Sequence, residues 1–176
     1  MTTSNFNLQP DILEDEITKL IPLEEKHFEE LFKAASDPLI WEQHPSKDRS
    51  EREGFKTFFE AAINSKGAFL ILDKQTNELI GTTRFYDYKP EESSVAIGYT
   101  FITRKFWGGP YNSSNKKLLI DYAFQYVDSI LFHVGAENFR SQKAVLKLGA
   151  EKSRDMIITV NGIDMPYFEF ELKKNN

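Results

Sequence analysis

The run Phe106-Trp107-Gly108-Gly109-Pro110-Tyr111-Asn112 decides how this chain is interpreted. It stands between a predicted strand, 94–103, and a long apolar segment, 111–127, that is typical of a helix. The loop would therefore present free backbone N–H groups at a helix N-terminus, where the helix dipole favours anions and glycines allow a phosphate to approach closely. A Gly-Gly pair alone is more typical of an ordinary tight turn than of an anion site, so the motif needs support from elsewhere in the chain.

That support is the run Asn138-Phe139-Arg140-Ser141-Gln142, which again lies between a predicted strand, 130–135, and a predicted helix, 141–148. Two strand-to-helix junctions in succession indicate one ligand shared between neighbouring strands. Asn138 could instead simply cap its helix, worth about 1 kcal/mol, and the two roles are compatible.

Composition predicts one domain, 1–176, with residues 1–11 as a flexible N-terminal extension. The net charge of −5 argues against nucleic-acid or membrane partners and favours a cationic substrate. The chain has no cysteine, so disulfides and thiolate chemistry are excluded. Residues 1–11 lack the pattern of a signal peptide, and no apolar run reaches the ~20 residues needed to span a bilayer, so we expect a cytoplasmic protein.

Hydrophobic periodicity predicts the element order β α α β β β α β α β β. The predicted strands are 17–23, 68–73, 79–88, 94–103, 130–135, 153–160 and 165–172, and the predicted helices are 24–36, 51–65, 111–127 and 141–148. Asn161-Gly162 is typical of a two-residue hairpin between the last two strands. This order predicts an α/β (α+β) fold, with a mostly antiparallel sheet of about seven strands and helices on both faces.

Four stretches together resemble the GNAT superfamily of acyl-CoA-dependent N-acetyltransferases, and within it the RimJ/RimL-like branch that includes ribosomal-protein N-acetyltransferases. They are Ala96-Ile97-Gly98-Tyr99-Thr100-Phe101, Trp107 to Asn112 with Lys116, Asn138 to Ala144, and Lys147-Leu148-Gly149-Ala150. The order of predicted strands and helices matches too, so the resemblance covers nearly the whole chain.

The resemblance implies a sheet that splays between its fourth and fifth strands, with acetyl-CoA as cosubstrate in the opening. Backbone near Phe101 and Ile102 would pair with the pantetheine arm, and one N–H group there would stabilise the oxyanion formed when an amine attacks the thioester. The remaining cofactor-binding residues implied are Trp107, Gly108, Gly109, Tyr111, Asn112, Lys116, Asn138 and Ser141.

Three positions depart from the family pattern. Pro110 stands where many relatives have Gly, and it offers no N–H to a phosphate, although proline suits the first turn of a helix. Ala96 stands where relatives often carry a glutamate assigned to general-base chemistry. The tyrosine that many members use as general acid is absent, and Ser141 matches the serine that the RimL-like branch offers instead.

The missing base bears on the acceptor. A lysine side chain of pKa ~10.4 is neutral about one time in a thousand near neutral pH, whereas an α-amine of pKa ~8 is neutral about one time in five. This difference favours an α-amine or a weakly basic small amine as acceptor over a lysine side chain.

The acceptor should enter near Trp41 and His44, which lie between the first two predicted helices. His44 could take the proton of the amine, since a histidine of ordinary pKa ~6.5 suits that task; alternatively Trp41 is core and His44 a plain loop residue. Arg84 and Tyr86 could face the same cleft or belong to the core. The three histidines show no metal-ligand spacing, so we expect no metal.

Three basic side chains are ambiguous in the same way. Lys116, one turn beyond the loop, could meet a phosphate or be solvated, while Arg140 and Lys143 are surface charges unless they bind the 3′-phosphate of CoA.

The sequence therefore supports an acetyl-CoA-dependent N-acetyltransferase acting on a protein N-terminal α-amine or a small-molecule amine, as a monomer or homodimer. A catalytically weak acyl-CoA-binding module is the alternative. A nucleotide-binding regulator is disfavoured because the chain has no Walker motif and no Gly-x-Gly-x-x-Gly run.

Overall fold

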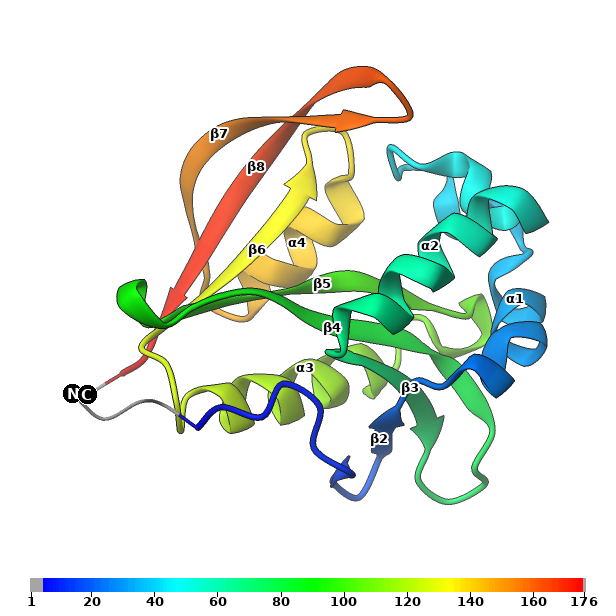
Figure 1. Cartoon of the computed structure of the whole chain (residues 1–176), viewed down its shortest axis with the longest axis horizontal. Helices are drawn as coiled ribbons and strands as arrows, with labels where there is room; N and C mark the ends of the chain where they lie inside the picture. Colours follow the sequence, from blue (N-terminus) through cyan, green and yellow to red (C-terminus); the bar gives the residue numbers. More distant parts are fainter. Residues whose placement is uncertain (1–4, 176) are drawn as a thin grey trace.

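A computed structural model describes residues 5–175 as one eight-stranded sheet with four α-helices (Figure 1). The strand order is β1-β2-β3-β4-β5-β6-β8-β7, and only the pair β5·β6 is parallel. The strands are β1 (Leu13–Glu14), β2 (Thr18–Pro22), β3 (Ala68–Asp73), β4 (Leu79–Lys89), β5 (Ser94–Ile102), β6 (Ser129–Gly135), β7 (Glu151–Val160) and β8 (Ile163–Lys173). The helices are α1 (Phe28–Ala35), α2 (Arg52–Ser65), α3 (Tyr111–Ala123) and α4 (Phe139–Lys147). Short 3-10 helices are η1 (Glu25–His27), η2 (Pro38–Trp41), η3 (Lys47–Ser50), η4 (Pro90–Glu92) and η5 (Arg104–Phe106).

The sheet is buried on both faces because its central strands alternate between two cores. In β3, Leu70 packs in a cluster with residues of α1 and α2, whereas Phe69 and Ile71 belong to a second cluster that includes Leu119 of α3. Val145 of α4 joins the second cluster. The predicted fold is therefore confirmed: the sheet is mixed and mostly antiparallel, and helices cover both of its faces (Figure 1).

The parallel pair β5·β6 separates soon after it begins. Register partners run only from Ser94↔Ser129 to Ala96↔Leu131, after which the two strands diverge (Figure 1). The rest of β5 has β4 on one side and no strand on the other. This is the opening that the family resemblance implied between the fourth and fifth predicted strands.

A bulge reshapes β5 at the opening. The β4·β5 register shifts between the pairs Thr82↔Phe101 and Arg84↔Gly98, and Tyr99 has a φ of 53°, in the left-handed region. Because bulges redirect side chains, Tyr99 and Phe101 both end on the α2 face, where each contacts the ring of Phe58.

Several element boundaries differ from expectation. The two-residue strand β1 brings the sheet to eight strands, and it has no periodic sequence signal because it is so short. Helix α3 ends at Ala123, four residues earlier than predicted, since Gln125 and Tyr126 form tight turn bonds to Tyr122 and Ala123 and Asp128 then bonds to the Ser93 carbonyl. The Asn161-Gly162 turn is confirmed, with φ of 51° and 78° at its two residues.

Residues 5–11 pack against the domain, contrary to the expected flexible extension, and residues 1–4 lie outside the described chain. Phe6 is 9% exposed and stacks on Tyr126 with ring centres 4.8 Å apart, and it also meets Phe85, Tyr88 and Tyr122 edge-on or tilted. An aromatic side chain that finds four aromatic partners holds its segment in place. Within residues 5–175, no helix is both long and apolar enough to cross a membrane.

Phe6→Ala should lower the free energy of unfolding by about 3 kcal/mol, because it removes a buried aromatic ring from this cluster. The same substitution at Phe139, which is 59% exposed, is the matched control and should change stability by less than about 0.5 kcal/mol. Urea unfolding of the two variants measures both effects. If Phe6→Ala lowered the free energy of unfolding no more than the control does, residues 5–11 would not contribute to the core.

Candidate functional site

The loop before α3 has the geometry of an anion site. Helix α3 begins at Tyr111, and its first intrahelical bond runs from the Ser114 N–H to the Pro110 carbonyl, so the three preceding helical amides lack intrahelical acceptors. Gly108 has a φ of 75°, and a side chain there would meet no atom within 4 Å. The loop surface is therefore open, and amides at a helix N-terminus face it.

The two strand-to-helix junctions meet across the opening. The guanidinium carbon of Arg140, in the first turn of α4, lies 3.9 Å from the centre of the Trp107 ring. Asn138 caps α4 by accepting a hydrogen bond from the Ser141 amide at 3.4 Å, so its capping role is confirmed. The predicted cofactor residues of both junctions thus border one space, with Ser141 half-buried in the first turn of α4.

The two β5 residues expected beside pantetheine are both buried, on opposite faces of the strand. Phe101 packs with the α1–α2 cluster and Ile102 with the α3 cluster, so only their backbone could serve a ligand. The Ile102 carbonyl already accepts a 2.7 Å hydrogen bond from Trp107 Nε1. The indole therefore holds the loop against the unpaired edge of β5.

The side chains of two further predicted cofactor-binding residues, Tyr111 and Lys116, point away from the loop surface. The Tyr111 hydroxyl donates to Asp73 Oδ2 at 3.1 Å. Lys116 is 7% exposed and its Nζ lies 2.5 Å from Thr100 Oγ1, beneath β5. Burial lowers the pKa of Lys116 from 10.5 to about 7, which fits a neutral buried amine better than a phosphate ligand.

The residues between the first two helices are mostly structural. Trp41 is 2% exposed, and its Nε1 donates to the Ala35 carbonyl. His44 Nδ1 accepts from the Ser46 amide at 2.9 Å, and burial, with Arg49 beside it, lowers the pKa of His44 to about 3. So weak a base is poorly suited to take a proton from an amine near neutral pH.

A buried relay on the same face provides a better proton acceptor. The Tyr86 hydroxyl lies 2.8 Å from His133 Nδ1, and His133 Nε2 lies 3.0 Å from Glu169 Oε2. Arg154 and Ser153 also donate to Glu169, and together with His133 they hold the pKa of this carboxyl below its usual range although burial raises it. We assign the neutral tautomer with Nε2–H donating to the carboxylate, which leaves Nδ1 to accept from tyrosine.

Sequence reasoning placed Tyr86 in this cleft but missed His133 and Glu169. The sequence did contain a signal for each of them, a polar residue between two apolar residues of a strand. His133 stands between Phe132 and Val134, and Glu169 stands between Phe168 and Phe170. Only the register His133↔Glu169 shows that they are neighbours.

The relay lies at the bulge of β5. The Tyr86 ring passes so close to Gly98 that a β-carbon there would lie 3.1 Å from it, and it meets the Tyr99 ring edge-on at 4.9 Å. Arg84, on the same strand, is 5% exposed and places its guanidinium carbon 3.8 Å from the centre of the Tyr99 ring. Tyr86 and Arg84 thus both face the α2 side of the opening.

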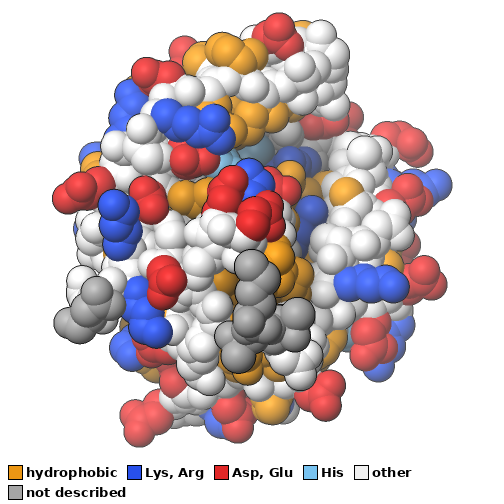
Figure 2. Space-filling view, turned by 60° about the vertical axis from the view of Figure 1, so that its left-hand side comes forward, with side chains coloured by type: hydrophobic (Ala, Val, Ile, Leu, Met, Phe, Trp, Pro, Cys, Tyr) orange, Lys and Arg blue, Asp and Glu red, His pale blue; other side chains and the backbone are white. Residues whose placement is uncertain are grey.

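The segment 41–46 spans the two halves of the sheet on this side. Gln43 Oε1 accepts from the Arg140 amide at 3.1 Å, and Pro45 packs so closely on Gly135 that a β-carbon there would lie 2.7 Å from its Cγ. Figure 2 shows this face hollowed beneath the β7–β8 hairpin, with histidine, arginine or lysine and hydrophobic side chains on its walls.

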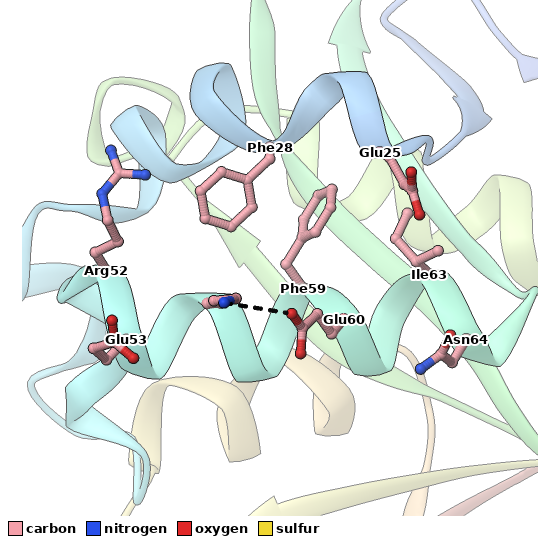
Figure 3. Close-up of a pocket in the computed structure, with 9 residues that line it drawn as sticks. Glu25, Phe28, Arg52, Glu53, Phe59, Glu60, Ile63 and Asn64 are labelled. Carbon is pink, nitrogen blue, oxygen red and sulfur yellow. Dashed lines mark ion pairs between the residues drawn. The ribbon is translucent and has the colours of Figure 1, made fainter.

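A second hollow is unrelated to these residues. A groove of about 670 Å³ lies between η1–α1 and the outer face of α2, where Phe28, Phe59 and Ile63 are surrounded by charged side chains (Figure 3). It contains no residue of the predicted site, and the ion pair drawn within it, Lys56–Glu60, is an ordinary exposed helix pair. Within residues 5–175, no group of three or more His, Asp or Glu side chains could hold a metal ion.

Comparison with known proteins agrees with this geometry. The family described as "Acetyltransferase (GNAT) domain" matches residues 18–151. No curated protein sequence matches the chain. A GCN5-related N-acetyltransferase from Brucella melitensis superposes with a TM-score of 0.80 at 20% identity, covering 96% of this chain and 83% of that one.

Two other solved structures are similar. A candidate ribosomal-protein-serine acetyltransferase from Vibrio cholerae gives a TM-score of 0.72 at 16% identity, covering 98% of this chain and 100% of that one. The Microcin C7 self-immunity acetyltransferase MccE, solved with acetyl-CoA and AMP, gives 0.77 at 14% identity, covering 96% and 99%. At these identities the likeness shows the fold.

Lys116→Met should stabilise the protein at pH 6.5 by about 2 kcal/mol or more. The folded-state pKa of about 7 lies below the ordinary lysine value of 10.5, so the unfolded chain holds the proton more tightly and burying the amine is costly at low pH. That cost disappears as the pH rises from about 7 toward 10.5, so the advantage of the variant should shrink at pH 9.5. Exposed Lys117→Met is the control, and an advantage independent of pH would contradict the buried lysine.

Proposed function

Because the chain belongs to the GNAT family of acetyltransferases, we propose that it transfers the acetyl group of acetyl-CoA to a primary amine in the manner of the RimJ/RimL-like branch. The observation that carries the proposal is the opening between β5 and β6, which has an amide-rich helix N-terminus on one side and the Tyr86–His133–Glu169 relay on the other. Cofactor and acceptor would meet at the bulge of β5 from opposite sides.

Acetyl-CoA would lie with its pyrophosphate on the loop before α3. The amides of Gly108, Gly109, Tyr111 and Asn112 are the donors available, and Pro110 supplies none. The pantetheine arm would run along the unpaired edge of β5, and Arg140 could shift from the Trp107 ring to meet a phosphate.

The reaction needs a neutral amine. In the proposed step, the amine nitrogen attacks the thioester carbon, a backbone N–H of β5 near the bulge stabilises the oxyanion, and the carbon–sulfur bond then breaks. The amine proton passes to the Tyr86 oxygen as the tyrosine proton moves to His133 Nδ1, and the Glu169 carboxylate stabilises the resulting imidazolium. This relay would do the work of the glutamate that Ala96 replaces.

The thiolate of CoA needs a proton as it leaves. Ser141 lies in the first turn of α4, where the helix dipole favours a developing negative charge, so we assign its hydroxyl to donate a hydrogen bond to the CoA sulfur as the carbon–sulfur bond breaks, and the thiolate then takes its proton from water. The acceptor is the α-amine of a protein N-terminus or of a small molecule, and similarity to the Vibrio cholerae protein supports the former. No nucleic acid, membrane or metal is needed, and the site could work in a monomer or a homodimer.

The second candidate is an acyl-CoA-binding module with little catalytic activity, which Ala96 and Pro110 favour. Both candidates predict that acetyl-CoA stabilises the fold, by about 2.7 kcal/mol at a hundred times the dissociation constant. Release of free CoA thiol with a panel of N-terminal peptides, amino acids, polyamines and aminoglycosides separates them. We expect release with at least one amine; thermal stabilisation without release from any acceptor would support the binding module.

His133→Gln should lower kcat by about 10²–10⁴-fold, because it removes the proton acceptor behind Tyr86. The shift in melting temperature caused by acetyl-CoA should stay unchanged. His27→Gln, at a half-buried position in η1 outside the site, is the matched control and should keep full activity. If His44→Gln abolished turnover while His133→Gln did not, the proton would go to His44 and the relay would be structural.

A further inference from the structure

Two arginines bring positive charge to the same buried place beside the relay. The guanidinium carbon of Arg49, in η3, lies 4.6 Å from the centre of the Phe58 ring and 5.8 Å from that of Tyr99. For Arg84, in β4, the corresponding distances are 5.5 and 3.8 Å. Burial lowers the pKa of both guanidinium groups. The pKa of Arg84 falls to about 10, and the charge of Arg49 contributes to that fall.

Neither arginine has a carboxylate partner within residues 5–175. The buried Nε of Arg84 makes no hydrogen bond, and its Nη2 reaches only the Phe58 carbonyl, at 3.5 Å. Arg49 Nη1 has the His44 ring nitrogen at 3.5 Å. That nitrogen carries the proton, because Nδ1 of the same ring accepts from the Ser46 amide, so it gives Arg49 no good acceptor.

Three arginines nearer the surface have the carboxylate partners that Arg49 and Arg84 lack. Arg52, Arg104 and Arg154 each pair with a carboxylate, respectively Glu29, Asp37 and Glu169. Arg140, the remaining arginine outside the pair, stacks on Trp107 instead. Arg49 and Arg84 therefore lack a counter-ion at a place where burial penalises their charge. A guanidinium that is desolvated, held by aromatic rings and left without a partner is suited to receive a carboxylate or phosphate from a ligand.

The position of the pair fits the acceptor. Arg84 precedes Tyr86 by two residues on β4, so the two side chains share a face and their Cα atoms are about 7 Å apart. The Tyr99 ring contacts both side chains. An anionic group on Arg49 and Arg84 would thus lie a few bonds from an amine at the Tyr86 hydroxyl.

We propose that the acceptor is an acidic amine, whose carboxylate or phosphate group is bound by Arg49 and Arg84 while its amine faces Tyr86. This assignment rests on the proposed acetyltransferase function and names its substrate class. It reverses the expectation of a cationic substrate drawn from the net charge of −5, since the local field of two arginines would repel a polyamine.

The test is CoA-thiol release from acetyl-CoA with dipeptide amides that share one α-amine. Ala-Asp is compared with Ala-Asn, and Ala-phosphoserine with Ala-Ser, so that only the anionic group varies and the two pairs distinguish a carboxylate from a phosphate. We expect kcat/KM to be at least 10-fold higher for the acidic member of one pair. In Arg84→Gln and Arg49→Gln that ratio should fall toward one, whereas in exposed Arg52→Gln it should not change. Equal rates within both pairs would overturn the proposal.

A binding measurement separates this inference from the activity. The acetylated products, N-acetyl-Ala-Asp and N-acetyl-Ala-phosphoserine amides, are titrated into the protein with CoA present, each against its neutral counterpart. If one acidic product binds at least 10-fold more tightly and Arg84→Gln removes the difference, the anion site stands even where no turnover is found. If binding is equal for acidic and neutral products, the anion site is wrong even where turnover is found.

Discussion

The site depends on one constraint, the early end of the β5·β6 pairing. Register pairing stops after Ala96↔Leu131, and the unpaired edge of β5 then borders the opening, where Gly98 and Thr100 are half-buried and Tyr99 is 40% exposed. Buried backbone polar groups need partners, and the protein meets part of that need itself through the bond from Trp107 Nε1 to the Ile102 carbonyl. The remaining edge is where an extended ligand with its own amide groups can add hydrogen bonds.

The split also explains why the chain builds contacts across it. Arg140 stacks on Trp107, Gln43 accepts a hydrogen bond from the Arg140 amide, and Pro45 packs on Gly135. These contacts fix the separation of two halves that strand pairing joins only from Ser94 to Ala96. They also place the amide-rich start of α3, the first turn of α4 and the relay around one space, which is the preorganisation that transfer between two substrates requires.

The sequence predicted those features that depend on local patterns. The apolar run within residues 68–73 predicted a strand, Asn161-Gly162 predicted the last hairpin, and the glycines before Tyr111 marked the loop. It could not predict features set by register. His133 meets Glu169 only because β6 pairs with β8 at one register, and Tyr99 faces α2 only because a bulge shifts β5. Lys116 was expected near phosphate, but its position on α3 directs it under the sheet to Thr100.

The central claim is that the opening between β5 and β6 binds acetyl-CoA. A crystal structure of the protein with CoA tests it most directly. The account predicts the pyrophosphate within hydrogen-bond distance of the amides of Gly109, Tyr111 and Asn112, with the pantetheine arm paired to β5 beyond Ala96. CoA bound elsewhere, for example in the groove between α1 and α2, with the β5 edge left empty, would contradict it.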